Sequence, residues 1–425
     1  MKGKSALMSG VAAVALVAFA QAGYAQKSGS DSMSNSTPAP MAQPAPTGPT
    51  TQELAARIDA LEAELQQSEV REAADHDAIA GWQPSSGWWD NTSISGRMYW
   101  DLSDITNKNN GVANTNNGTH FDIKRFYIGV DHKFDDVWSA NITTDFTYDS
   151  TVGATQVFIK KAYLQGKFDD ALIMRIGSAD MPWIPFDEGV YGYRYIENTL
   201  VDRVKYGTSA DWGVHLLGSY GDDLKFEYAF SAVNGAGYKK PGMGLGTNRS
   251  EGMDYEGRVD VKYMGFVAAV GGYSGKLGND HGPGTTFHTA QRFDALLGYV
   301  GNGFHAGVEY FSDTNYDTVT NSKSDSGDGW EGFASYQFLP EWAVFGRYDV
   351  VKPQKGVLFQ PHFTNNYENV GIEWTPTKIV SFSFVYKHDG GHDGSFADQN
   401  GTIGGTSTST SGAYNEFGVF GQLQW

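Results

Sequence analysis

Charged residues of both signs recur at alternate positions over most of the chain, and this spacing is the feature that could carry chemistry. Successive side chains of a strand point to opposite faces, so residues two apart share a face. The basic residues on this face are Arg97, Arg125, Lys161, Arg175, Lys225, Arg258, Lys262, Arg292 and Arg347. The acidic residues on it are Asp101, Asp131, Asp145, Glu227, Glu256, Asp260, Asp294, Glu309, Asp349 and Glu373. A dry core cannot hold so many charges, because removing each from water costs too much free energy. The sequence therefore predicts a water-filled interior.

A wet interior inside a closed wall would conduct small solutes. Opposed basic and acidic side chains on a pore wall create a transverse field, which orders water and sorts solutes by polarity. The alternative is that these charges pair with one another and only hold the wall together. If the basic residues face a pore, neutralising Arg125 and Arg175 should weaken the passage of anions.

The longest segment between two expected strands is residues 181–210, which is longer than most loops and therefore indicates a function. Its two prolines, many aromatic residues and mixed charges favour a segment that folds into the lumen, where a wide barrel needs a constriction. The residues predicted to form the constriction are Asp187, Glu188, Arg194, Glu197, Asp202, Arg203 and Lys205. The alternative is an external loop that packs against a neighbouring subunit.

The elements that would position these residues are strands with one apolar face, and the last stretch shows the pattern well. Phe417, Val419, Leu423 and Trp425 share one face, while glutamine and glutamate side chains occupy the other. An amphipathic strand needs water on one side and an oily phase on the other. A closed barrel in a membrane meets both needs, because closure leaves no unpaired edge in lipid.

Tight turns divide the chain from Thr92 onward into strands. The expected turns are Asp135-Asp136, Asp169-Asp170, Gly221-Asp222-Asp223, Met264-Gly265, Gly301-Asn302, Pro340-Glu341 and Pro376-Thr377. With longer loops between them they predict an all-β fold, a sixteen-stranded antiparallel transmembrane β-barrel. The expected strands are 92–104, 120–133, 136–149, 155–168, 171–180, 211–219, 224–233, 253–263, 266–275, 288–300, 303–313, 328–338, 341–351, 363–374, 377–387 and 412–425. The strand 155–168 alternates poorly at Lys160-Lys161.

The N-terminal part differs from the barrel region 92–425. Residues 1–25 combine basic Lys2 and Lys4 with a short apolar run and a small-residue cleavage site, which predicts a signal peptide and export. Residues 26–50 are typical of a disordered linker. Residues 51–80 carry a short heptad pattern, which predicts a periplasmic helix or coiled coil that helps an oligomer assemble. The alternative is a lone amphipathic helix resting on its own barrel. The formal charge of −18 excludes a typical nucleic-acid role, whereas the mean hydropathy of −0.40 does not decide between soluble and membrane proteins.

Part of the chain resembles a known family. The stretch Phe121-Asp-Ile-Lys-Arg-Phe-Tyr-Ile-Gly-Val-Asp131, then Lys161-Ala-Tyr-Leu164 with Met174-Arg-Ile-Gly177, and then Tyr195-Ile-Glu-Asn-Thr-Leu200, is similar to the phosphate-selective porin O and P family. The resemblance implies a trimeric channel with an inward third loop and basic lumen residues that guide anions. This chain has Asp180 where the family usually has a lysine, so the resemblance implies the channel and not its substrate.

Taken together, the patterns predict a porin of the bacterial outer membrane that passes small hydrophilic solutes or ions by diffusion. Its expected partners are outer-membrane lipid, two further copies of the chain, and small solutes or anions. The alternatives are a structural or adhesive barrel that links envelope layers and a sugar-specific channel. No enzymatic activity or cofactor is expected, since the chain has no cysteine and no serine elbow, and an enzyme is the third alternative. No metal is expected, since the histidines at 388 and 392 lie in a glycine-rich loop without a supporting scaffold.

Overall fold

The computed structural model describes residues 86–114, 117–149, 153–240, 251–280, 286–355, 362–404 and 411–425. The predicted signal peptide, linker and periplasmic helix lie outside these ranges. Within them, none of the helices has the length and apolar character needed to cross a membrane.

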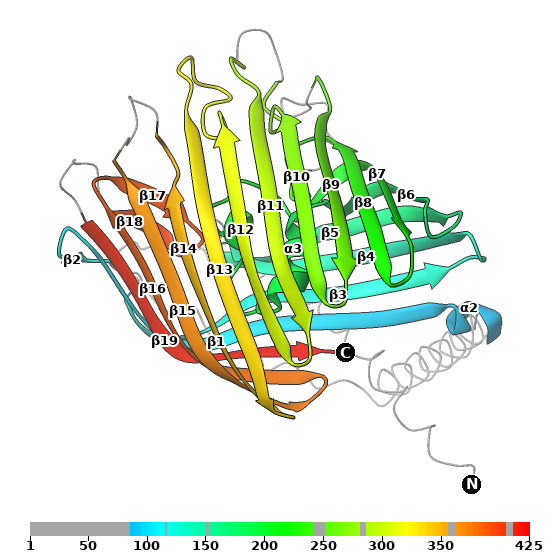
Figure 1. Ribbon diagram of the computed structural model, residues 1–425, viewed down its shortest axis with the longest axis horizontal. Coiled ribbons are helices and arrows are strands. Elements are labelled where there is room, and N and C mark those ends of the chain that lie inside the picture. Colours follow the sequence, from blue (N-terminus) through cyan, green and yellow to red (C-terminus); the bar gives the residue numbers. More distant parts are fainter. Residues whose placement is uncertain are drawn as a thin grey trace, which may run out of the picture. The chain divides into compact units, whose positions relative to one another are not determined.

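Seventeen strands form one sheet, and sixteen of them close it into an antiparallel barrel (Figure 1). The exception is β2 (Val112–Ala113), which lies in the hairpin that follows β1. The wall consists of β1 (Thr92–Asn109), β3 (Gly118–Lys133), β4 (Trp138–Asp149), β5 (Ala154–Lys167), β6 (Ile173–Asp180), β7 (Ala210–Tyr220), β8 (Leu224–Val233), β9 (Asp254–Tyr263), β10 (Phe266–Gly275), β11 (Ala290–Gly301), β12 (Phe304–Thr314), β13 (Ser326–Leu339), β14 (Trp342–Lys352), β15 (Thr364–Thr377), β16 (Val380–His392) and β19 (Ser411–Gln424). The predicted fold class and strand number are confirmed.

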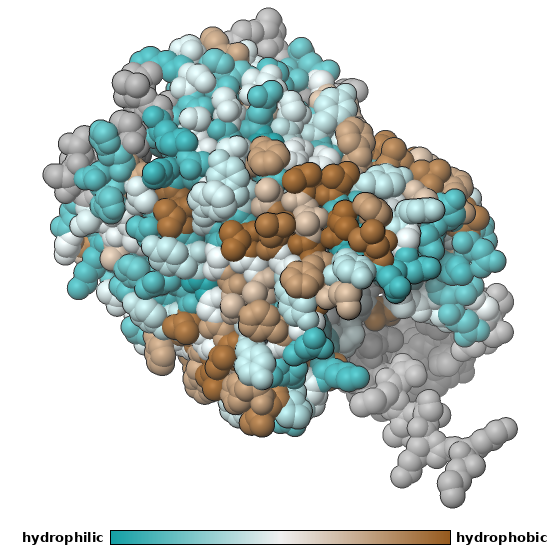
Figure 2. Space-filling model, viewed as in Figure 1, coloured by the Kyte–Doolittle hydropathy of each residue, from teal (hydrophilic) through white to brown (hydrophobic). Residues whose placement is uncertain are grey.

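The wall presents its apolar side chains outward. On β8, Leu224, Phe226, Tyr228 and Phe230 are exposed, whereas Ala229 is buried. Figure 2 shows apolar side chains gathered across the middle of the strands, with polar side chains toward the long loops. Such a band suits the hydrocarbon of a membrane.

The barrel closes between its first and last strands. β1 pairs with β3 on one side and with β19 on the other, from Arg97 opposite Gln424 to Asn109 opposite Gly412. The backbones of Gly96 and Trp425 exchange two hydrogen bonds of 3.2 and 3.1 Å. Both strands therefore lack a free edge along this seam, as lipid requires.

A side chain at position 96 should weaken this seam. A Cβ atom built on Gly96 would lie 1.9 Å from the indole of Trp425, so Gly96→Val must displace that ring. We expect a loss of stability of about 1–3 kcal/mol, as in other overpacked sites. The measurement is the fraction of barrel that keeps its folded mobility on SDS gels as temperature rises. Gly332→Val is the matched control, since a Cβ there meets no atom within 4 Å. Equal loss in both variants would contradict the expectation.

The segment between β6 and β7 lies inside the barrel and forms most of its apolar core. It contains α3 (Ile184–Tyr191) and α4 (Leu200–Arg203). Proline near the start of α3 suits its first turn. Gly192, with φ of 83°, ends the helix in the left-handed region and donates its N–H to the Glu188 carbonyl. Trp183, Ile196 and Leu200 have no exposed surface, so the segment is packed rather than loosely suspended.

The ends of the barrel differ from each other. Seven short turns mark one end, called the short-turn end, and the long loops mark the other. Residues 264–265 and 302–303 combine two positive φ angles each, which is typical of tight hairpin turns. In the last long loop, β17 (Ser395–Asp398) and β18 (Gly401–Gly404) form a hairpin that the sequence pattern did not predict, and β16 continues to His392, beyond its expected end.

The short α2 (Ser86–Asp90) precedes β1. Thr92 donates its hydroxyl to the Trp88 carbonyl at 3.0 Å, which ties the helix to the start of the wall. The barrel therefore begins directly after this helix.

Candidate channel lumen and constriction

The irregular strand 155–168 contains a β-bulge. Thr143 pairs with Lys161 and Thr144 with Ile159, so Lys160 has no partner across the strand pair. The extra residue lets two adjacent lysines reach the interior. Lys161 forms an ion pair of 2.6 Å with Asp180, and the Lys160 ammonium lies 4.6 Å from the centre of the Tyr127 ring.

A second bulge lies on β3. Tyr99 pairs with Arg125 and Trp100 with Ile123, which leaves Lys124 unmatched. The Lys124 ammonium donates to the Ile196 carbonyl of the inward segment at 2.9 Å. Strict alternation places Lys124 on the outer face, so Lys124 was not among the residues predicted to line the pore. The available signal was a pair of adjacent cations in an otherwise alternating strand, as at Lys160.

The first half of the inward segment follows the inner wall from β9 to β16. Trp183 donates its backbone N–H to Glu256 at 2.8 Å and its indole N–H to Glu309 at 2.7 Å. Further on, the ring of Tyr193 stacks on Phe345 with centroids 4.2 Å apart. These contacts press α3 and the tyrosines against one side of the barrel.

The return half is anchored by buried ion pairs. Arg203 contacts Asp349 at 2.9 Å, Asp389 at 3.4 Å and Asp398 at 2.7 Å, and all four side chains are fully buried. The Arg203 guanidinium also lies 4.7 Å from the centre of the Tyr367 ring. One cation thus holds three carboxylates that come from β14, β16 and β17.

Two residues predicted to line the pore lie beneath this segment. Arg292 pairs with Asp294 at 2.8 Å and also donates to the Tyr206 carbonyl. Arg347 pairs with Glu331 and donates to the Asn198 carbonyl at 2.6 Å. Both arginines are buried, so they contact the inward segment rather than open water.

The other seven predicted pore-lining residues fall into two groups. Five form ion pairs: Arg125 with Asp145, Lys161 with Asp180, Lys225 with Glu227, Arg258 with Asp260, and Lys262 with Glu227. Arg97 donates to the Tyr99 hydroxyl, and Arg175 donates to the Gln165 amide oxygen. Neither of these two has an ion-paired carboxylate within the described ranges.

The predicted constriction residues also divide by environment. Arg194 bridges Glu188 at 2.7 Å and Asp202 at 3.3 Å, and this cluster keeps partial exposure. Lys205 is exposed. The other three, Asp187, Glu197 and Arg203, are buried against the wall.

The pKa values of two buried carboxylates, Glu197 and Asp187, shift in opposite directions. Burial opposes ionisation of Glu197, but Lys387 and Lys124 outweigh it and lower the pKa of Glu197 to about 2. For Asp187, burial raises the pKa to about 7. Neither carboxylate oxygen of Asp187 has a hydrogen-bond partner in the described structure.

Two cavities lie between the segment and the wall of β1 to β5. One, of about 720 Å³, includes the short-turn residue Ile379 and is lined by Arg97, Tyr99, Lys160 and Arg194. The other, of about 600 Å³, reaches the long loops at residues 399–401 and is lined by Lys124, Arg125, Lys387 and Glu416. Together they mark the side of the lumen that the segment leaves open.

Four cations without an ion pair lie on the wall from β1 to β6, and three of them, Arg97, Lys124 and Lys160, line these two cavities. Arg97, Lys124, Lys160 and Arg175, all on β1 to β6, have no ion-paired carboxylate among the described residues. In contrast, the inward cations described on β8 to β16 all form ion pairs: Lys225, Arg258, Lys262, Arg292, Arg347 and Lys387. Carboxylates line the same two cavities, Asp131, Asp180 and Glu188 in one and Asp101, Asp122, Glu197 and Glu416 in the other, so the open side carries both signs of charge.

Three histidines, His215, His388 and His392, contact polar side chains in the described part of the chain. His215 and Ser231 lie 2.7 Å apart, but the other ring nitrogen of His215 has no carboxylate partner there. His388 contacts Asn415, and His392 contacts Asp393. No group of three potential metal ligands occurs within the same ranges.

A closed sixteen-stranded barrel with an apolar outer band and an inward third loop defines the class of outer-membrane β-barrels. Residues 93–186 match the family model of phosphate-selective porin O and P, which confirms the resemblance predicted from the sequence. No curated protein matches the chain.

Solved structures of similar fold include two outer-membrane proteins. The anion-selective porin from Comamonas acidovorans has a TM-score of 0.53 and 10% identity, covering 79% of this chain and 100% of its own. OmpT of Vibrio cholerae has a TM-score of 0.51 and 12% identity, covering 79% of this chain and 97% of its own. At such identities the likeness shows the fold alone.

Proposed function

We propose that the protein is an outer-membrane porin through which small hydrophilic solutes diffuse, with anions favoured over cations. The observation that carries the proposal is that Arg97, Lys124 and Lys160, which form no ion pair with the described residues, line the two cavities that the inward segment leaves open. The family match over residues 93–186 supports the channel.

The overall charge of −18 favours cations, but it is not the charge that a solute meets inside. Exposed charges farther away than the Debye length of about 8 Å are largely screened, and low-dielectric walls focus the field of nearby groups. Asp349, Asp389 and Asp398 are buried against Arg203, away from the open side. Arg97, Lys124 and Lys160 line the open cavities themselves, so a solute there meets these three cations directly.

The assembly and export of the protein are part of the same proposal. Residues 1–25 act as a signal peptide, the barrel enters the outer membrane, and the heptads of residues 51–80 join three copies. Exposed apolar residues such as Leu297 and Val308 on the outer wall support contact with lipid. Leu61→Asp with Leu65→Asp should convert the trimer to smaller species on native gels, and an unchanged oligomer would exclude the coiled-coil role.

Selectivity tests the proposal most directly. In planar bilayers with a salt gradient, we expect constant current steps and a reversal potential of the sign set by anions. The double variant Arg97→Gln with Lys160→Gln should lower the anion-to-cation permeability ratio several-fold, because it removes two cations that line the open cavity and leaves its carboxylates in place.

Lys133→Gln is the control, since Lys133 is exposed at the short-turn end and pairs with Asp136. A reversal potential of the sign set by cations would refute the anion preference, and an unchanged ratio in the double variant would refute the role of Arg97 and Lys160. Both outcomes leave the channel intact. Absence of current steps at every voltage would refute the channel and favour a structural barrel.

A further inference from the structure

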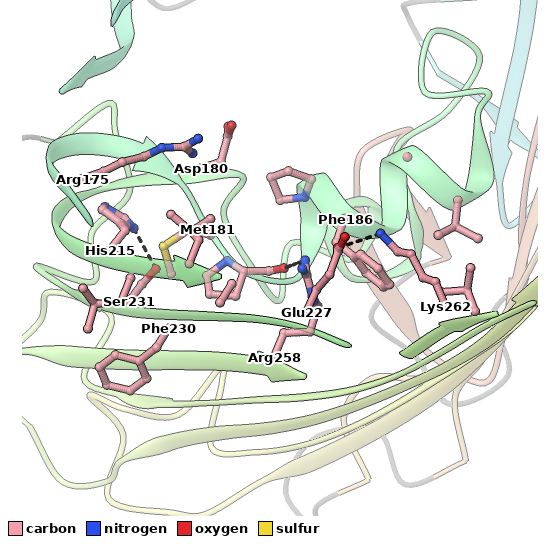
Figure 3. A pocket seen from close by; sticks show the side chains of 18 of the residues that line it. Arg175, Asp180, Met181, Phe186, His215, Glu227, Phe230, Ser231, Arg258 and Lys262 are labelled. Carbon is pink, nitrogen blue, oxygen red and sulfur yellow. Dashed lines mark hydrogen bonds and ion pairs between the residues drawn. The ribbon is translucent and has the colours of Figure 1, made fainter. Parts of the chain in front are cut away.

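A third cavity, of about 550 Å³, lies between α3 and the inner faces of the strands from β6 to β11 (Figure 3). Its lining combines an apolar floor with charged groups at both ends. We propose that this cavity is a binding subsite for small carboxylates that carry an apolar or aromatic body. This inference rests on the proposed channel function and names a class of solute for it.

The apolar floor comes from α3 and the wall beneath it. Phe186 and Val190 of α3 line the cavity together with Val267 of β10 and Val300 of β11. A lumen that only passed water and simple ions would gain nothing from such a surface. An apolar group that leaves water does gain from it, in proportion to the area it covers.

Arg258, whose charge is already paired with Asp260, holds the Phe186 ring in place. The Arg258 guanidinium lies 4.0 Å from the centre of the Phe186 ring, donates to the Pro182 carbonyl at 2.7 Å, and pairs with Asp260 at 2.9 Å. Figure 3 shows Phe186 and Arg258 side by side, with Lys262 bonded to Glu227 at the same end. The aromatic face is therefore preorganised before any solute arrives.

The other end supplies a cation for a carboxylate. Arg175 donates only its Nε–H to Gln165, at 2.8 Å, and lies 4.9 Å from the Tyr163 ring centre. Nearby Asp180 is engaged by Lys161 at 2.6 Å. Since Arg175 forms no ion pair within the described ranges, its remaining N–H groups can bind a carboxylate in the paired geometry that guanidinium favours.

The two features together select a class of solute. A hydrated inorganic anion would meet Arg175 but would gain nothing from Phe186. A neutral aromatic solute would contact the apolar floor but would form no ion pair with Arg175. The volume lies within the usual range for small-molecule sites, about 300–1,000 Å³, so one ring-sized solute fits with some water.

Transient block of the channel current tests the inference. Benzoate, acetate and benzyl alcohol are added in turn to the full-length trimer in planar bilayers, at constant ionic strength. We expect benzoate to interrupt the current at concentrations at least about tenfold lower than acetate, and benzyl alcohol to be inactive. Equal potency of benzoate and acetate would overturn the subsite.

Variants separate the two contributions. Phe186→Ala should remove most of the difference between benzoate and acetate, and Val300→Thr, which keeps the shape, should reduce it without disturbing α3. Arg175→Gln should weaken block by benzoate, while Lys133→Gln should leave it unchanged. Block that persists equally in Phe186→Ala, Val300→Thr and Arg175→Gln would place the bound solute elsewhere and refute the proposal.

Failure of the subsite and failure of the channel give different results in this experiment. A chain that gives no current steps fails as a channel, whereas a chain that conducts anions but does not distinguish benzoate from acetate fails only as an aromatic-carboxylate site.

Discussion

Replacing Arg203 with methionine is expected to release the return half of the inward segment and to enlarge the open channel. Arg203 is the cation shared by Asp349, Asp389 and Asp398, and all four side chains are fully buried. Methionine fills similar space but leaves Asp389 and Asp398 without their counter-ion. Asp349 loses one of its two partners and keeps the ion pair of 2.8 Å with Arg347. Breaking a buried pair in this way typically costs about 3–5 kcal/mol.

The barrel wall should survive this change, because its strands pair with one another and not through Arg203. We therefore expect larger and noisier current steps in bilayers, together with a lower thermal transition. Lys205→Met is the control, since it lies on the same segment but is exposed. Arg203→Lys should give an intermediate result, because it keeps the charge but loses the fork of donors. Current steps of native size and noise in Arg203→Met would show that the aromatic contacts alone hold the segment.

The strands were predictable from sequence because the rules that form them are local. Alternation along Leu224, Phe226, Tyr228 and Phe230, together with the tight turns, defines each hairpin without reference to the rest of the chain. Closure then follows from the physical chemistry of lipid, which tolerates no unpaired edge. The unpredicted hairpin of β17 and β18 lies in a polar loop, where neither alternation nor lipid imposes a pattern.

The environment of each charge was less predictable. Arg97 and Arg347 have the same type and the same inward orientation, yet one lines an open cavity and the other is buried in ion pairs. The difference depends on which part of the wall the inward segment covers, and alternation contains no information about this. Alternation therefore identifies most of the inward residues but does not separate those that meet solute from those that anchor the segment.

The bulges show a local signal that can refine this interpretation. Lys124-Arg125 and Lys160-Lys161 each place two cations next to each other, which costs free energy if one of them must face lipid. In both cases the strand gains an extra residue and turns both side chains inward. Adjacent like charges within an alternating strand thus indicate a bulge, and here they mark two of the four cations that form no ion pair with the described residues.

The second large effect is a pH dependence of the contact between α3 and the inner wall of the barrel. We call α3 attached when it packs on this wall and detached when it has moved away. Asp187 faces Thr199 and Glu188 of the inward segment, Glu309 of β12, Glu331 of β13 and Arg347 of β14. Burial raises the pKa of Asp187 from 3.8 to about 7, so the attached state favours the protonated carboxyl. The attached state consequently binds more protons than a detached state between about pH 4 and pH 7. By linkage, the stability of the attachment is full below about pH 4, falls as pH rises through that window, and levels off above about pH 7.

We therefore expect the noise of the open current, which reports movement of α3, to increase as pH rises from about 5 to 8. A change of one pKa unit corresponds to about 1.36 kcal/mol, so detachment should become at least about tenfold more frequent. Asp187→Asn cannot ionise and should remove most of this dependence, leaving a quiet channel at pH 8. Asp169→Asn, in an exposed short turn, is the control that should behave like the native protein. If Asp187→Asn retains the native pH profile, the proton that governs the attachment of α3 lies on another group, and Glu309 and Glu331 become the next residues to replace.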